Sequence, residues 1–141
     1  MRNVVPILFT FLVASCSDSE SNVSFDDYLS QVRATAENGA RDCGNSDVPL
    51  NTELNTCVLE SFSNNMNAFA VYKLDGIDSV VYESIAIDSE NSVYRLTYDS
   101  DPTGAGSSNN GSIIVFECID PIPNGIVELP AAELFACSDQ E

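Results

Sequence analysis

The chain has 141 residues, with 22 acidic side chains against five Lys and Arg, and a formal net charge of −17 at pH 7. Nucleic acid is therefore excluded as a partner, because phosphate binding needs a patch of Lys and Arg. No His is present, so the commonest general base and activator of a Ser or Cys nucleophile is missing, and we expect no enzyme activity. Acidity of this degree favours cationic proteins or divalent cations as partners. The length suits one domain.

The amino-terminal segment has the layout of a secretory signal. Arg2 is positively charged, the stretch from Val4 to Val13 is almost entirely apolar, and Ala14 and Ser15 are small. The apolar stretch is too short to span a bilayer. These residues predict export from the cytoplasm.

The residues Leu12-Val13-Ala14-Ser15-Cys16 resemble the lipobox of bacterial lipoproteins. In that family the Cys sulfur carries a diacylglycerol, the signal is cleaved before the Cys, and the new amino group is acylated. The resemblance implies that Cys16 is lipidated and that acyl chains hold the protein on the membrane. An ordinary exported protein whose Cys16 pairs elsewhere is the alternative. Ser17 in place of Asp resembles the sorting pattern that favours the outer over the inner membrane of the cell envelope.

Three parts follow from this division of the chain. Residues 1–15 are the predicted signal peptide, and residues 16–23 are the lipidated Cys and a flexible polar tether. Residues 24–141 form a single predicted α+β domain. Removal of Arg2 with the signal leaves the mature chain still more acidic.

Two helices are predicted at the start of this domain. The first runs from Phe25 to about Glu37, with Ser24 as its cap and Asp27 at its third position. The second runs from about Thr52 to Phe62, because apolar side chains recur every fourth residue. The segment from Ala40 to Leu50 is expected to be a loop.

Alternating apolar residues then predict four strands. These are Ala68 to Leu74, Val80 to Ile87, Val93 to Tyr98 and Ile113 to Cys118. In the last of them, Ile114, Phe116 and Cys118 are expected to face one way, with Cys118 pointing inward. The segment from Pro130 to Cys137 is expected to be a short helix. The sum is two helices that cover one face of an antiparallel four-stranded meander. This order resembles the α-α-β-β-β layout of small outer-membrane assembly lipoproteins and of β-lactamase inhibitor modules.

Four cysteines remain once Cys16 is lipidated, and an even count in an exported domain predicts two disulfides. We favour Cys43 with Cys57 and Cys118 with Cys137, because short closures cost the least chain entropy. A bond between Cys57 and Cys118 is the alternative. The cysteine spacing and the lack of His disfavour a zinc site.

The loop from Asp99 to Gly111 is the segment richest in potential ligands. Asp99, Asp101, Thr103 and Gly104 match the first half of the EF-hand pattern, although Asn110 stands where that pattern has Glu. Calcium is therefore a possible cofactor, and its candidate ligands are Asp99, Asp101, Thr103 and Asn110. The same loop is alternatively a flexible hairpin connection or a protein contact. The candidate contact residues are Asp99, Asp101, Gly104, Gly106 and Asn109.

Short motifs of the mature domain resemble small, uncharacterised bacterial lipoproteins. They are Cys43-Gly44, Cys57, Gly76-Ile77-Asp78 and Tyr98 to Pro102. We interpret the chain as a lipid-anchored, non-catalytic envelope protein that binds a protein partner through its sheet or through the Asp99–Gly111 loop. One alternative is an inhibitor of a cationic envelope-attacking enzyme, such as a lysozyme or a protease. The other is a calcium-dependent surface protein.

Overall fold

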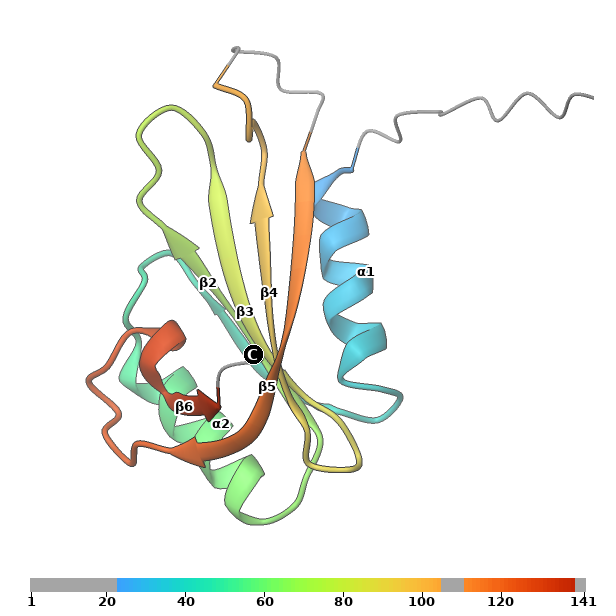
Figure 1. The fold of residues 1–141 in the computed structure, drawn as a ribbon, viewed down its shortest axis with the longest axis vertical. Helices are drawn as coiled ribbons and strands as arrows, with labels where there is room; N and C mark the ends of the chain where they lie inside the picture. Colours follow the sequence, from blue (N-terminus) through green and yellow to red (C-terminus); the bar gives the residue numbers. More distant parts are fainter. Residues whose placement is uncertain (1–22, 105–110, 139–141) are drawn as a thin grey trace, which may run out of the picture.

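The computed structural model of the protein describes residues 23–104 and 111–138. They form two α-helices, one short 3-10 helix and a six-stranded sheet, which confirms the predicted α+β class (Figure 1). The elements in chain order are α1 (Phe25–Thr35), β1 (Arg41–Ser46), α2 (Thr52–Ser63), β2 (Ala68–Leu74), β3 (Val81–Ile87), β4 (Val93–Asp99), β5 (Ser112–Pro123), η1 (Ala131–Glu133) and β6 (Phe135–Ser138).

The sheet is larger than the predicted meander. Its strands lie in the order β1 to β6, with β1 parallel to β2 and all other neighbours antiparallel. The expected four-stranded meander corresponds to β2 through β5, so the strand count was wrong by the two flanking strands. Strand β1 was expected to be a loop because its sequence, Arg-Asp-Cys-Gly-Asn-Ser, has no apolar alternation. Backbone pairing with β2 creates this strand, not burial of its side chains.

The carboxyl-terminal region also differs from its prediction. Only residues 131–133 form a 3-10 turn, and the expected helix gives way to strand β6. Strand β5 continues to Pro123 because its second half pairs with β6 through Ile119 to Pro123. A register irregularity between Ile119 and Ile122 accommodates Pro121, and Pro123 is the last residue of the strand, since proline is tolerated at bulges and edges.

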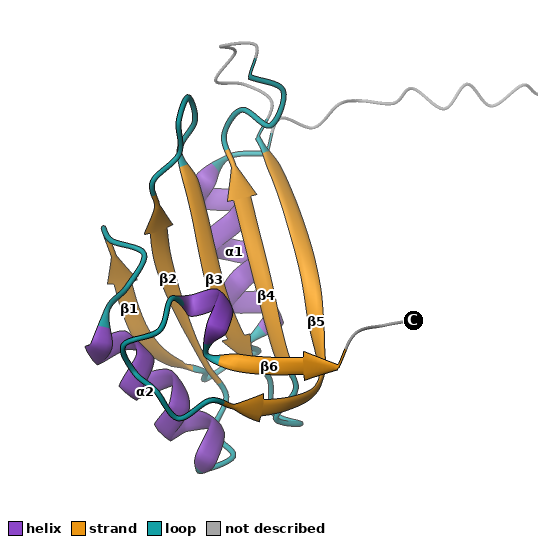
Figure 2. Cartoon of the chain, turned by 60° about the vertical axis from the view of Figure 1, so that its left-hand side comes forward, coloured by secondary structure: helices purple, strands orange, loops and turns teal. Residues whose placement is uncertain are grey.

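The two helices lie on opposite faces of the sheet, not on one face as predicted. Figure 2 shows α2 and β6 in front of the sheet and α1 behind it. The reason is the parallel pairing of β1 and β2, because α2 is the crossover that connects them. The crossover commits α2 to one face and leaves the other face for α1.

Each helix begins where the sequence predicted. The Ser24 hydroxyl accepts from the backbone N–H of Asp27, and the Asp27 carboxylate accepts from the backbone N–H of Ser24. These reciprocal bonds form a capping box. The Ser24 hydroxyl also donates to the Asp27 carboxylate at 2.6 Å, and this bond, followed by the one from the Ser24 N–H, lowers the pKa of Asp27. At α2, the Asn51 side chain accepts from the N–H groups of Glu53 and Leu54.

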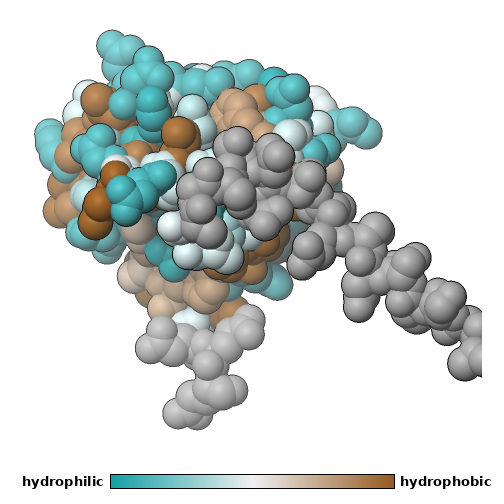
Figure 3. All heavy atoms as spheres, turned by 90° about the horizontal axis from the view of Figure 1, so that it is seen from above, coloured by the Kyte–Doolittle hydropathy of each residue, from teal (hydrophilic) through white to brown (hydrophobic). Residues whose placement is uncertain are grey.

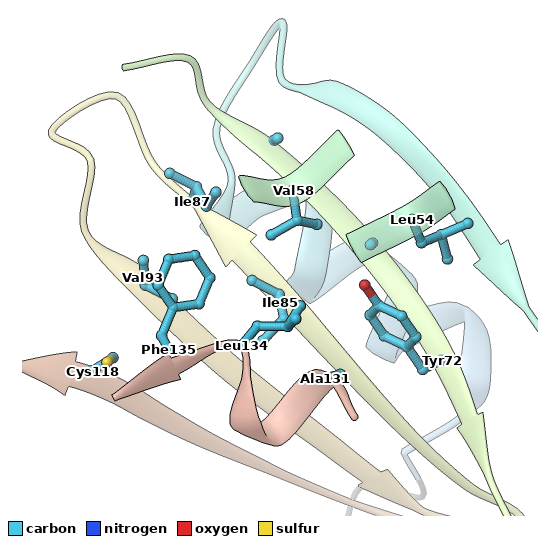
Figure 4. Close-up of a cluster of buried hydrophobic side chains, with 12 residues drawn as sticks. Leu54, Val58, Tyr72, Ile85, Ile87, Val93, Cys118, Ala131, Leu134 and Phe135 are labelled. Atoms are coloured by element: carbon cyan, nitrogen blue, oxygen red, sulfur yellow. The ribbon is translucent and has the colours of Figure 1, made fainter. Parts of the chain in front are cut away.

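Two apolar cores result, one on each face of the sheet. The α1 side buries aromatic side chains, and the Tyr28 hydroxyl there donates to the Leu96 carbonyl at 3.1 Å. Tyr98 is buried in the same cluster, and its ring centroid lies 5.5 Å from that of Tyr28. The α2 side is drawn in Figure 4, and its labelled residues are Leu54, Val58, Tyr72, Ile85, Ile87, Val93, Cys118, Ala131, Leu134 and Phe135.

Both favoured disulfides are present. Cys43 on β1 bonds to Cys57 on α2, with Cα atoms 5.7 Å apart. Cys118 on β5 bonds to Cys137 on β6, with Cα atoms 5.0 Å apart. Cys118 is 3% exposed, which confirms its inward orientation. The bonds fasten the two flanking strands that the sequence pattern did not predict.

Candidate functional site

The two edges of the sheet are built differently. Strand β1 is short and polar, its register shifts between Asp42 and Asn45, and a disulfide holds it to α2. These features protect an edge from pairing with other chains. The opposite edge is the first half of β5, residues 112–117, which we call the β5 edge. Its register with β4 has no shift, and within the described chain β6 pairs only with the later residues of β5.

The β5 edge is also apolar on its outside. Ile114 is 65% exposed and Val115 is 49% exposed, and the two side chains point to opposite faces of the sheet. Their neighbours Ile113 and Phe116 are half-buried, against the α1-side and the α2-side core respectively. An edge strand with β-branched residues on both faces is suited to pairing with a further strand.

An uncovered area of the sheet adjoins this edge. On the α2 side, the register aligns Leu74, Val81, Asp99 and Ser112 in one row across the sheet. Leu74 and Val81 are half-buried, and Val80 and Ile77 next to them are 43% and 98% exposed. Figure 2 shows that α2, η1 and β6 cover only the lower part of this face. Figure 3 views the molecule from above the upper end of Figure 1, and hydrophobic residues are interspersed there among hydrophilic ones.

Charge divides the two sides of the β5 edge. On the α2 side, the Arg95 guanidinium lies over the Phe116 ring, 4.8 Å from its centroid. On the α1 side, exposed Glu117 pairs across the ladder with Tyr94. Burial, then Asp88 and then Glu117 raise the pKa of that tyrosine. Asp27 lies on the same side. Burial, Asp99, Tyr82 and Asp27, in this order of size, raise the pKa of Tyr98. The α1 side is therefore acidic.

A buried carboxyl group lies below the uncovered area. Glu83 is 8% exposed, and burial raises its pKa, against the opposing effects of Arg95 and of a hydrogen bond from the Ala132 N–H. The Arg95 Nη1 donates to the Ala132 carbonyl at 3.2 Å. Both ionisable groups thus hold the peptide groups of η1, so we assign them a structural role.

The predicted interaction loop is described only in part. Asp99 closes β4, its Oδ1 accepts from the Asp101 N–H at 2.9 Å, and Asp101 is buried. The Thr103 hydroxyl donates to Asp101 Oδ1 at 3.1 Å. Gly104 has a φ of 65°, which suits a turn. The remaining predicted residues of the loop, Gly106, Asn109 and Asn110, lie outside the described residues, as does Cys16.

The candidate calcium ligands stay a prediction. In residues 23–104 and 111–138, no group of three or more Cys, Asp and Glu side chains is arranged to hold a metal ion. The described ligands Asp99, Asp101 and Thr103 instead bond within their own turn. The same part of the chain has no helix that is long and apolar enough to cross a membrane.

The surface hollows do not suggest another site. One hollow on the described surface, about 560 Å³, is an open depression beside the end of α1, lined in part by Arg33, Glu37 and Phe69. Another, about 320 Å³, lies along α2 and contains the exposed ion pair of Arg41 and Glu60, whose charged atoms are 3.7 Å apart. Comparisons with known protein families, curated proteins and solved structures found no match.

The sequence pattern predicted strand β5 but not the exposure of its outer side chains. The alternation correctly placed Ile114, Phe116 and Cys118 on one face of β5. It also implied that Ile114 is covered, because Cys118 faces the core. The signal that was missed is the unbroken run Ile113-Ile114-Val115, which is apolar on both faces.

Proposed function

We propose that the chain is a lipid-anchored, non-catalytic protein of the bacterial cell envelope that binds a protein partner through the β5 edge and the uncovered sheet face beside it. The observation that carries the proposal is an apolar edge strand, residues 112–117, that pairs with no described strand on its outer side, whereas the opposite edge is protected. Natural sheets avoid such edges because they template unwanted pairing. A partner that covers the edge explains why it is kept.

The membrane part of the proposal is supported by the sequence at the amino end. Lipidation at Cys16 would tether the domain by a short polar segment, and Ser17 favours the outer membrane. The described domain begins at α1, and its first described residue, Val23, lies beside the start of β5. Two disulfides suit a domain exposed to an oxidising compartment.

Inhibition of a cationic envelope-attacking enzyme is the second candidate. It is favoured by the net charge of −17 and by the acidic α1 side of the edge. Electrostatic steering by such a surface speeds encounter with a basic enzyme. The candidate predicts inhibition that weakens with salt, and inhibition that is unchanged in about 0.5 M salt would contradict it.

The proposal is tested by photocrosslinking in intact native cells. A photoreactive amino acid replaces Ile114 in one variant and Thr56, an exposed residue of α2, in a control variant. We expect one stoichiometric protein adduct from position 114 and none from position 56. Absence of an adduct at position 114, or the same adducts from both positions, would contradict a binding site at the β5 edge.

A further inference from the structure

We infer that the β5 edge takes an extended segment of a partner protein as an added strand, and that this segment alternates apolar and basic side chains. The inference rests on the proposed function and specifies the chemistry of the partner. Strand addition uses the backbone of an open edge for affinity and alternate side chains for specificity. Both components are present at residues 112–117.

The backbone requirement is met by the regularity of the edge. The β4–β5 pairing runs from Val93 with Cys118 to Asp99 with Ser112 without a shift. The prolines of β5, at positions 121 and 123, fall beyond the edge, so every residue of the edge has an N–H group. At about 3.3 Å per residue, this segment offers roughly 20 Å of strand to a partner.

The side-chain requirement on the α2 side is apolar. An added strand would place every second side chain on this side, next to Ile114 and Phe116. Arg95 lies over the Phe116 ring and would repel a basic side chain there. The neighbouring strands continue the surface with Thr97, Asp99, Val81 and Leu74, which are half-buried. Apolar side chains on this side of the partner strand would cover Ile114.

The requirement on the α1 side is a positive charge. The side chains here are Ile113, Val115 and Glu117, and the nearby acidic groups are Asp27 and Asp88. No described Lys or Arg lies on β5 or on the α1 side of β4. Basic side chains on this side of the partner strand would pair with the carboxylates at the rim, where such pairs guide association.

A second copy of the chain fits this edge poorly. Pairing of two β5 edges would bring two chains of net charge −17 together. Both would also bring an exposed Glu117 to the interface, and residues 112–123 contain no Lys or Arg to offset these charges. The edge therefore discriminates against its own copy and in favour of a cationic strand.

The test uses the disulfide-bonded protein from residue 17 onward and three synthetic peptides. They are Val-Lys-Val-Lys-Val-Lys, its counterpart with Glu for Lys, and the Lys peptide with alternate backbone nitrogens methylated. Amide chemical shifts and amide exchange are measured by NMR at increasing peptide concentration. We expect the Lys peptide to shift and protect the amides of residues 112–117, at least about tenfold more tightly than the Glu peptide. The methylated peptide should not bind, since its methylated nitrogens cannot donate backbone hydrogen bonds to the β5 edge.

Matched variants locate the charge effect. Glu117→Gln should weaken binding of the Lys peptide about threefold and reduce its salt dependence, whereas Glu53→Gln on the exposed start of α2 should change neither. Equal binding of the Lys and Glu peptides, binding of the methylated peptide, or no response at residues 112–117 would each overturn the inference. So would a dimer in sedimentation that Ile114→Glu dissociates. Cellular crosslinks at position 114 would still support the proposed function in these cases.

Discussion

Asn55 is the polar residue on which the packing of the carboxyl-terminal segment depends. Its side chain is fully buried in α2. The Oδ1 atom accepts from the Tyr72 hydroxyl at 2.8 Å, and Nδ2 donates to the carbonyls of Val127 and Leu129 at 2.7 and 2.8 Å. One amide thereby joins α2, the sheet and the irregular segment before η1, and burial raises the pKa of Tyr72.

Replacement of Asn55 should therefore be costly. Asn55→Ala leaves a buried hydroxyl and two carbonyls without their partner, so we expect the free energy of unfolding to fall by about 3 kcal/mol. Urea denaturation measures it. Thr56→Ala, at the exposed neighbouring position, is the control and should change stability by less than about 0.5 kcal/mol. A loss below about 1 kcal/mol for Asn55→Ala would show that water satisfies these groups equally well.

Glu83 gives stability a pH dependence of unusual sign for a carboxyl group. Its pKa is raised in the folded protein above the usual 4.5, chiefly by burial. The folded state therefore retains a proton that the unfolded chain has released, and stability falls as the pH rises through the raised pKa. The contribution of Glu83 is fully favourable only below about pH 4.5.

A comparison of Glu83→Gln with the wild type isolates this effect from the other carboxylates. Gln stays neutral and keeps an acceptor for the Ala132 N–H, so its stability relative to the wild type should increase from about pH 4 to about pH 8. Thermal unfolding across this range provides the measurement. A difference that is independent of pH would contradict the raised pKa.

At the scale of elements, β6 is held by one covalent bond and a short ladder. It has four residues, and three of its residue pairings with β5 are defined. The Cys118–Cys137 disulfide closes a separation of 19 residues, and Phe135 packs on Phe62 of α2 with ring centroids 5.0 Å apart. The covalent bond thus reinforces an element too short to be stable alone.

Removal of this bond should release the carboxyl-terminal segment. The pair Cys118→Ala and Cys137→Ala should lower stability by about 3 kcal/mol and make the region after Pro123 sensitive to protease. The pair Cys43→Ala and Cys57→Ala is the control, with a similar loss of stability but without this cleavage. Resistance of both variants to cleavage would mean that the β5–β6 ladder suffices.

An element could be predicted from the sequence where its side chains are buried in a regular pattern. The side chains of strand β2 point alternately into the two cores, and its predicted bounds, Ala68 to Leu74, are those observed. Strand β1 has a polar sequence and is formed by pairing with β2, so no local pattern indicates it. The placement of the helices depended on β1, because the parallel crossover sends α2 to the face opposite α1.

The same reasoning explains the limits on the site. Alternation gives the face to which a side chain points, as for Ile114, but coverage of that face depends on elements distant in the sequence. Here α2, η1 and β6 cover only the lower part of that face (Figure 2), and Ile114 stays exposed. The disulfide pairing, by contrast, followed from short separations, which chain entropy favours.

At the scale of the whole molecule, the predicted membrane anchor is separate from the proposed binding surface. The predicted anchor is Cys16, and the proposed surface is the β5 edge. Cys16→Ser should therefore leave an uncleaved precursor or a soluble form in cell fractionation, because the acyl chains are absent. Unchanged processing and membrane partitioning of this variant would contradict lipidation at Cys16, without bearing on the edge.

The most direct measurement of the central claim is hydrogen exchange of residues 112–117 in native envelopes and in the purified protein. We predict that the outward amides of this segment exchange freely in the purified protein and at least about tenfold more slowly in envelopes, because a partner strand covers them. Exposed residues at the start of α2, Thr52 and Glu53, are the internal control, and their amides should exchange alike in both preparations. Equal exchange of residues 112–117 in the two preparations would contradict a partner at the β5 edge.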